Sequence, residues 1–149
     1  MIRKDIRNIA IIAHVDHGKT TLVDELLKQS GVFRANQEVA ERVMDSNDIE
    51  RERGITILSK NTAVFYKDVK INILDTPGHE DFAEDTYRTL TAVDSVIIVI
   101  DGAKGVETQT RKLMEVCRMR NTPVMVFINK LDRPCKDPFD LLDEIEKEL

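Results

Sequence analysis

The sequence has little of what marks secreted or membrane proteins. Its 149 residues include two cysteines, four prolines and no tryptophan. Two cysteines without metal-ligand spacing cannot form a disulfide framework, which favours a reducing cytoplasm. No apolar run is long enough to cross a bilayer, and the first residues lack the apolar stretch of a signal peptide, so we expect no membrane partner. The net charge of −5 disfavours autonomous nucleic-acid binding.

What is present suits one globular domain. Hydrophobic residues make up 42% of the chain and charged residues 33%, which allows a sizeable core under a well-solvated surface. Five short apolar runs predict strands, and three of them are almost continuously apolar, as parallel strands covered on both faces are. The strands are expected at residues 8–13, 62–66, 69–74, 95–100 and 124–128. The second and third lie too close together for a crossover, so they predict an antiparallel hairpin.

Helical patterns alternate with these runs and predict helices at residues 20–29, 82–93, 106–118 and 138–149. In the last helix Asp137 is expected at the N-cap, with Phe139, Leu142, Ile145 and Leu149 facing inward. The alternation predicts a three-layer α/β fold with a mostly parallel sheet and one antiparallel hairpin strand. Residues 34–57 are rich in charge and carry no apolar face, which predicts a long loop that is either functional or disordered.

The strongest motif is AHVDHGKT, residues 13–20, between the first strand and the first helix. A phosphate-binding loop needs this arrangement, because backbone N–H groups at the start of the helix then point at the phosphates. Lys19 is expected to reach the β- and γ-phosphates, and the Thr20 hydroxyl to ligate Mg²⁺. Ala13 stands where the strict pattern has glycine. The other nucleotide contacts expected from this segment are Asp16, His17, Gly18 and Thr21.

Two motifs are expected to meet the γ-phosphate and its metal. In DTPGH, residues 75–79, Asp75 is placed to hold Mg²⁺ through water, and the Gly78 N–H to approach the γ-phosphate. Alone, this motif would be an ordinary turn. In RGITI, residues 53–57, Thr56 is placed to give Mg²⁺ a second hydroxyl. Residues 34–57 would then form a switch that the triphosphate orders and hydrolysis releases.

The motif NKLD, residues 129–132, is expected to select the base. The Asp132 carboxylate can accept both the N1–H and the 2-amino group of guanine, a pair of bonds that adenine cannot form. Asn129 can bond the base edge, and the stem of Lys130 can pack along the ring. The motif therefore favours guanine and disfavours an ATP-specific phosphate-loop protein.

Together, HVDHGKT, RGITI, DTPGH and NKLD resemble the motifs of the translational GTPases, over essentially the whole chain. The resemblance implies a P-loop GTPase-like fold. It implies that His79 orients the attacking water, that Val15 and Ile55 form a hydrophobic gate beside it, and that Asp16 is associated with a monovalent cation. It also implies the ribosome as a partner, although the ribosome-binding domains of that class have no counterpart in this sequence.

The resemblance is uneven along the chain. Residues 1 to about 74 look like the BipA/TypA family, whereas the sequence from about residue 75 looks like bacterial release factor three. We interpret this mixture as a chimera or designed recombinant joined near INILDTPGH. The fifth motif of the class, which contacts guanine O6, and the final strand and helix of the domain are missing. We therefore expect residues 1–149 to be a truncated domain with weakened affinity for the base.

These observations predict a guanine-nucleotide-binding domain that depends on Mg²⁺ and hydrolyses GTP slowly, by in-line attack of water on the γ-phosphate. The alternative is a truncated or engineered nucleotide-binding scaffold without significant turnover.

Overall fold

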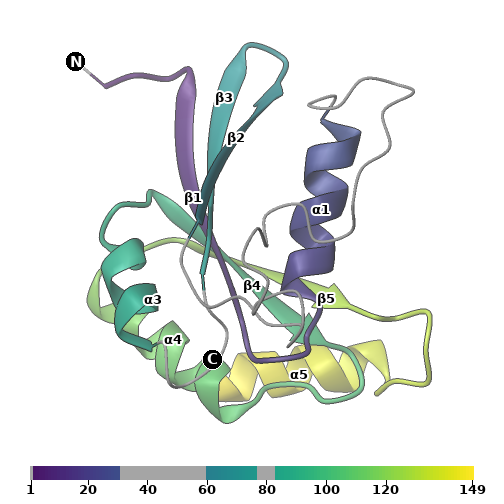
Figure 1. Ribbon diagram of the computed structural model, residues 1–149. Helices are drawn as coiled ribbons and strands as arrows, with labels where there is room; N and C mark the ends of the chain where they lie inside the picture. The colour runs from purple at the N-terminus through teal and green to yellow at the C-terminus, as the bar shows by residue number, and fades with distance from the viewer. Residues whose placement is uncertain (1, 31–59, 77–82) are drawn as a thin grey trace.

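The computed structural model describes residues 2–30, 60–76 and 83–149. Its centre is a five-stranded sheet in the order β2-β3-β1-β4-β5 (Figure 1). β1 is parallel to β3 and β4, β4 is parallel to β5, and β2 runs antiparallel to β3. The strands are β1 (Ile6–Ala13), β2 (Lys60–Tyr66), β3 (Val69–Asp75), β4 (Ser95–Asp101) and β5 (Val124–Asn129).

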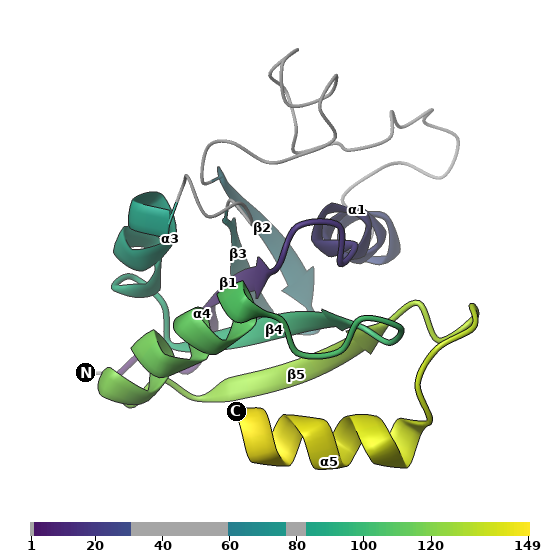
Figure 2. The same ribbon diagram turned by 90° about the horizontal axis from the view of Figure 1, so that it is seen from below.

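In the described part of the chain, four helices cover the two faces of this sheet. They are α1 (Lys19–Gln29), α3 (Ala83–Leu90), α4 (Thr108–Met119) and α5 (Pro138–Glu148). Figure 2 shows α1 on one face and α3, α4 and α5 on the other. The arrangement confirms the predicted three-layer α/β fold with one antiparallel strand, and none of the described helices combines the length and apolarity needed to cross a bilayer.

The two faces carry separate cores, because β1 and β4 bury side chains on both sides. On one face Val23 and Leu27 of α1 pack with Ile11 of β1 and Val99 of β4. On the other, helix residues such as Leu113 pack against neighbouring strand positions, including Ile12, Ile98 and Ile100. This double burial explains why these strands are almost continuously apolar.

The predicted strands are confirmed to within two residues at every end. Two of the helices are more than one residue shorter at one end than predicted. The helix predicted at 82–93 ends at Leu90, since the Thr91 and Ala92 N–H groups donate to carbonyls only three residues back, in a tight turn. The helix predicted from residue 106 begins at Thr108. The Asp137 cap is confirmed: its carboxylate accepts from the Phe139 N–H at 2.9 Å.

The predicted inward face of α5 was partly wrong. Phe139 and Leu142 are 78% and 55% exposed, whereas Leu141 is fully buried. Ile145 and Leu149 do pack inward, against the core on the α4 face of the sheet. Leu141, Ile145 and Leu149 are spaced four residues apart, so α5 buries one narrow stripe, and Phe139 and Leu142 lie to its sides.

Candidate functional site

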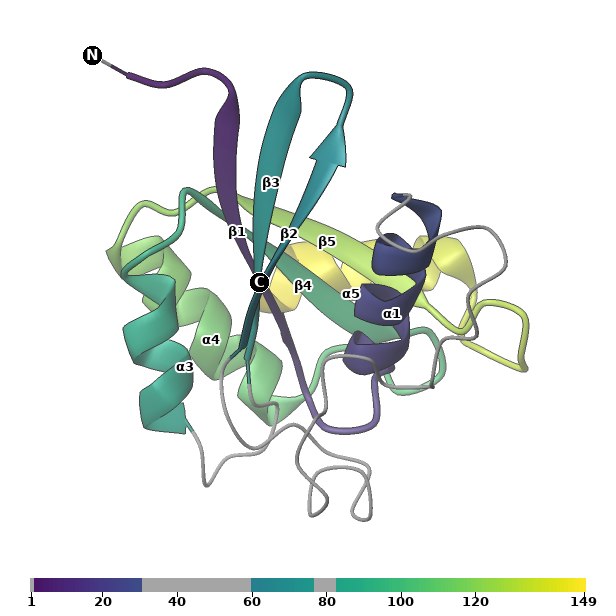
Figure 3. The same ribbon diagram turned by 45° about the horizontal axis from the view of Figure 1, so that its top comes forward.

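The predicted nucleotide residues that the structure describes lie at the carboxyl ends of the parallel strands. Figure 3 shows the loops after β1, β4 and β5 at the same end of the sheet. Sequence-distant loops meet there because parallel strands place all their carboxyl ends at one edge. In open α/β sheets this edge is where ligands bind.

The segment between β1 and α1, residues 14–18, is a compact turn, which we call the phosphate loop. Its His17 N–H donates to the His14 carbonyl at 3.3 Å. Asp16 and Gly18 have φ angles of 66° and 87°, in the left-handed region that glycine and, less readily, aspartate adopt. α1 begins directly afterwards, without a side-chain cap and without an acidic residue in its first turn. Its first N–H groups therefore face a region that suits an anion.

Gly18 is required by contact as well as by backbone angle. A Cβ added there would lie 2.4 Å from the side-chain nitrogen of Asn129. Asn129 ends β5, and its Nδ2 donates to the His17 carbonyl at 3.1 Å. The motif predicted to bind the base thus touches the phosphate loop directly.

Lys130 also connects residues 129–132 to the phosphate loop, and its ammonium forms an ion pair with a buried carboxylate. Its Nζ donates to the Asp16 carbonyl and lies 2.9 Å from Asp101 Oδ2. Asp101 ends β4 and is buried. Burial alone would raise the pKa of this carboxyl, but hydrogen bonds from Lys130 and from the N–H groups of Ala103 and Lys104 outweigh it and hold the pKa at about 2. Asp101 is therefore a fixed negative charge that anchors Lys130.

Lys19 and Asp75 form a buried ion pair, with Nζ 2.8 Å from Oδ1. Register explains their meeting, because Asp75 pairs with Ile11 across β1 and β3, and Lys19 follows β1 by one short loop. The lysine predicted to bind phosphate and the carboxylate predicted to hold Mg²⁺ are thus in contact. Thr76, the next residue, is also buried, and its hydroxyl donates to the Ile11 carbonyl at 2.8 Å.

His17 lies inside the domain and not at its surface. Its ring is fully buried beneath the phosphate loop, between β4 and the start of α4. Burial lowers the pKa of this ring, because the charged form would be desolvated. The structure therefore places the imidazole of His17 as a support of the loop.

The remaining predicted residues are distributed unevenly. Asp132 and Thr21 are exposed, Asp16 is exposed, and Val15 is half-buried. Thr20 is buried in the first turn of α1. Four predicted residues lie outside the described part of the chain, namely Ile55, Thr56, Gly78 and His79. The predicted switch segment 34–57 lies outside it as well.

Two residues of the site were not predicted, Asp101 and Glu107. Asp101 could have been predicted from the sequence, because it ends an apolar run in the way that Asp75 ends β3. Glu107, directly before α4, lies 2.7 Å from His14. No pattern in the sequence points to Glu107, since its partners His14 and His17 are about ninety positions away.

The donor set fits Mg²⁺ held together with phosphate. Mg²⁺ prefers one or two protein oxygens and fills the remaining positions with water and phosphate oxygens. The buried Thr20 and Asp75 supply such oxygens beside the Lys19 ammonium. Within residues 2–30, 60–76 and 83–149, no group of three or more His, Cys, Asp or Glu side chains could form an all-protein metal site.

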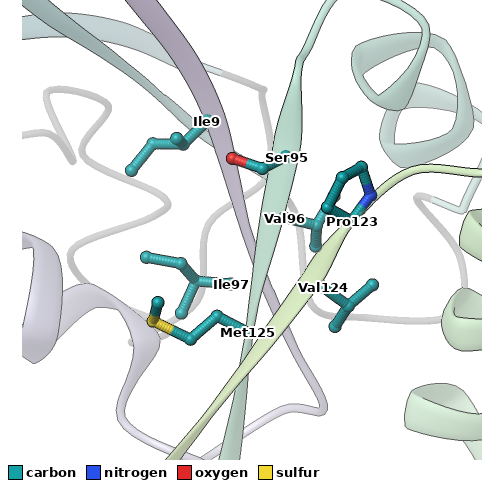
Figure 4. A pocket seen from close by; sticks show the side chains of 7 residues that line it. All are labelled: Ile9, Ser95, Val96, Ile97, Pro123, Val124 and Met125. Carbon is teal, nitrogen blue, oxygen red and sulfur yellow. The ribbon is translucent and has the colours of Figure 1, made fainter.

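An apolar groove of about 260 Å³ lies elsewhere on the sheet (Figure 4). Ser95 and Val124 begin β4 and β5, so the groove lies at the amino ends of these strands, away from the phosphate loop. None of its lining side chains is charged, so it offers nothing to bind phosphate. The lining residues are Ile9, Ser95, Val96, Ile97, Pro123, Val124 and Met125.

Comparison with known proteins gives a consistent result. The model of the elongation factor Tu GTP binding domain matches residues 4–149. The large ribosomal subunit assembly factor BipA of Bacillus subtilis (strain 168) is 58% identical over 144 residues, covering 97% of this chain and 24% of that protein. Peptide chain release factor 3 of Microcystis aeruginosa is 52% identical over 149 residues, covering 96% of this chain and 27% of that protein.

A crystal structure of a protein from Thermus thermophilus has the same fold. Its TM-score is 0.86 at 26% identity, covering 95% of this chain and 22% of that one. Both curated relatives match nearly the whole chain, and neither is confined to one half of it. The chain spans about a quarter of the length of these relatives.

Proposed function

The chain belongs to the family of the elongation factor Tu GTP-binding domain, and from this premise we propose that it binds GTP and GDP between its phosphate loop and residues 129–132. One observation carries the proposal. Asn129 donates to the His17 carbonyl at 3.1 Å, and Lys130 donates to the Asp16 carbonyl. The two segments are therefore held together, as a ligand with a base at one end and phosphates at the other requires.

At the phosphate end, the N–H groups of the phosphate loop and of the first turn of α1 bind phosphate oxygens. Lys19 binds the β- and γ-phosphates. Its side chain is already aimed at this edge of the sheet, where it pairs with Asp75. A phosphate oxygen can replace the carboxylate as its partner, so the ammonium needs no new desolvation when nucleotide enters.

Thr20 and Thr56 would give hydroxyl oxygens to Mg²⁺, and Asp75 would hold it through water. When bound, the metal would neutralise charge on the phosphates. Asp16, exposed at the tip of the loop, is the residue associated with a monovalent cation. The buried position of Thr20 and Asp75 beside Lys19 supports the assignment of these two residues to Mg²⁺.

At the base end, Asp132 accepts hydrogen bonds from guanine N1–H and the 2-amino group. Its exposed position leaves the carboxylate accessible to a ligand. Asn129 and Lys130 act mainly by fixing the motif to the phosphate loop, because their side-chain nitrogens are bonded to it. Guanine selectivity then rests chiefly on Asp132.

Hydrolysis proceeds by in-line attack of water on the γ-phosphate, with His79 orienting the water and the Gly78 N–H stabilising charge. Val15 and Ile55 form the hydrophobic gate beside His79. The phosphate loop contains no arginine that could stabilise the transition state from within. We therefore expect turnover orders of magnitude below that of typical enzymes.

The relatives are named for assembly of the large ribosomal subunit and for peptide chain release. We propose that this chain is likewise the nucleotide-binding part of a cytoplasmic translation factor that works with the ribosome. In the relatives, about three quarters of the protein lies beyond the matched segment. We propose that such additional segments carry ribosome-binding domains.

Titration of the purified chain with fluorescent GDP in Mg²⁺, followed by competition with unlabelled GDP and ADP, tests binding. Displacement by GDP and not by ADP is expected, and EDTA should weaken binding. Equal displacement by ADP would overturn the guanine assignment. Single-turnover hydrolysis of GTP by wild type and His79→Ala then separates a slow GTPase from a scaffold, because only a GTPase loses rate on the substitution.

A further inference from the structure

One carboxylate faces both histidines of the phosphate loop. His14 Nε2 lies 2.7 Å from Glu107 Oε2, and His17 Nε2 lies 3.7 Å from the same oxygen. The two rings are 5.4 Å apart and tilted by 51°. The three side chains form a cluster between the phosphate loop and the start of α4.

Glu107 stands at the N-cap of α4, yet its side chain does not cap the helix. Residues favoured at this position use a side-chain oxygen to accept an N–H of the first turn. In this structure only the main chain of Glu107 hydrogen-bonds to the helix, because its carbonyl accepts from the Arg111 N–H at 3.1 Å. The carboxylate is directed instead at the histidines, which points to a role outside the helix.

The backbone of β4 holds His17 at one ring nitrogen. Its Nδ1 lies 3.2 Å from the Asp101 N–H, which can only donate, and 3.4 Å from the Val99 carbonyl, which can only accept. Nδ1 therefore has a partner on β4 in either tautomer of the ring. Nε2 lies on the side of Glu107, at 3.7 Å from its oxygen. The carboxylate thus meets both imidazoles, His14 at hydrogen-bond distance and His17 at a longer electrostatic distance.

We propose that Glu107 is a positioning residue for the phosphate loop, holding His14 and orienting His17 so that the turn between them keeps its phosphate-binding conformation. The loop is then fixed from two sides. Asn129 and Lys130 bind its carbonyls at His17 and Asp16, whereas Glu107 holds the imidazoles of positions 14 and 17. The left-handed Asp16 lies between these two histidines and is retained by both sets of contacts.

This proposal rests on the proposed nucleotide binding and makes a distinct statement about it. Glu107 touches the loop and not the ligand, so its removal should speed nucleotide release without changing the choice of base. Glu107→Ala is expected to raise the dissociation rate of GDP about tenfold, the effect of losing one hydrogen bond to a charged group. Glu107→Gln keeps an oxygen that can accept from His14 Nε2–H, so most of the affinity should be rescued.

The experiment compares wild type, Glu107→Ala, Glu107→Gln and the control Glu115→Ala, an exposed glutamate on the same helix. Stopped-flow release of fluorescent GDP gives the dissociation rate, and competition gives the ratio of GDP to ADP affinity. The expected result is faster release in Glu107→Ala alone, with an unchanged ratio. A release rate equal to that of wild type in Glu107→Ala would overturn the proposal.

A second readout does not depend on nucleotide. The ring ¹⁵N signals of His14 and His17 should move in Glu107→Ala and stay unchanged in the control Glu115→Ala. Unmoved signals for His14 and His17 would refute the contact even if Glu107→Ala were destabilised. If wild type binds no guanine nucleotide, the proposed function fails, and the proposal about Glu107 fails with it. Wild-type binding with unchanged release in Glu107→Ala rejects the proposal alone.

Discussion

Lys19, the first residue of α1, and Asp75, the last residue of β3, form an ion pair at 2.8 Å in which both side chains are buried. Each is also predicted to meet a different part of the same ligand complex, Lys19 the phosphates and Asp75 the metal. The two charges thus form an ion pair at the place where an anion and a cation are expected to bind. This pairing gives the first prediction.

Lys19→Ala is expected to lower the free energy of unfolding by about 3–5 kcal/mol, because a buried carboxylate loses the cation that compensates it. Nucleotide binding should be lost as well. Urea unfolding of wild type and variant measures the first effect. Lys28→Ala, at an exposed position of the same helix, is the control and should change stability by less than about 0.5 kcal/mol. Equal stability of Lys19→Ala and Lys28→Ala would show that the ion pair does not stabilise the fold.

Gly18→Ala should damage stability and binding together. The φ of 87° strains any L-residue with a Cβ, and that Cβ would lie 2.4 Å from Asn129 Nδ2. We expect a cost of about 1–3 kcal/mol for the backbone conformation. Displacement of Asn129 should also weaken GDP binding. Thermal unfolding and GDP titration of the same variant measure both effects. Unchanged GDP affinity would show that Asn129 does not contribute to nucleotide binding.

Asp132→Asn should change the preferred base while leaving the fold intact. The carboxylate accepts two N–H groups of guanine, whereas an amide presents one donor and one acceptor and so matches the 2-oxo group of xanthine. GDP affinity should fall by a large factor, up to roughly 10⁴ in favourable cases. XDP affinity should rise. Competition with GDP, XDP and ADP measures this, and a variant that still prefers GDP would exclude Asp132 as the selecting residue.

The Asp101 carboxyl predicts how stability depends on pH. Its pKa is about 2 in the folded protein against an ordinary 3.8. The unfolded chain thus binds this proton more readily, and the stabilisation is complete above about pH 4 and lost as the pH falls through 2. At pH 7, Asp101→Asn should cost about 2 kcal/mol, the worth of hydrogen bonds to a charged group.

Urea unfolding of wild type and Asp101→Asn between pH 2 and pH 7 checks this dependence. The difference in the free energy of unfolding should shrink toward pH 2. Asp143→Asn, at an exposed position of α5, should follow the wild-type curve throughout. A difference between wild type and Asp101→Asn that stays constant with pH would mean that the pKa of Asp101 is the same in the folded and the unfolded chain.

Much of the fold could be predicted because this sheet is buried on both faces. Strands such as β4 must then be apolar at nearly every position, and the run SVIIVI leaves little choice of element. The face of α5 was harder to predict. Phe139, Leu141 and Leu142 are all apolar, and the periodicity does not say which of them meets the core. Packing against the neighbouring elements selected Leu141, which sequence periodicity alone cannot reveal.

That the motifs of Lys19 and Asn129 lie at one edge of the sheet could be predicted, because each motif comes at the carboxyl end of a strand; the roles of the two residues stay predictions. The site was not predictable where the chemistry depends on a distant partner. Glu107 is an ordinary residue before a helix until the fold brings it to 2.7 Å from His14. The bond from Asn129 to the His17 carbonyl is likewise a tertiary contact. The interpretation of the chain as a recombinant stays a prediction.

The contact between Gly18 and Asn129 limits how such a domain can be divided and inherited. The phosphate loop comes from the first half of the chain, whereas Asn129, Lys130, Asp101 and Glu107, which all touch it, come from the second. A segment exchanged between two related proteins must therefore bring side chains of the same reach and a glycine in the same place. The two halves of the sequence are therefore not interchangeable. Any viable exchange has to preserve the phosphate loop together with the four residues that contact it.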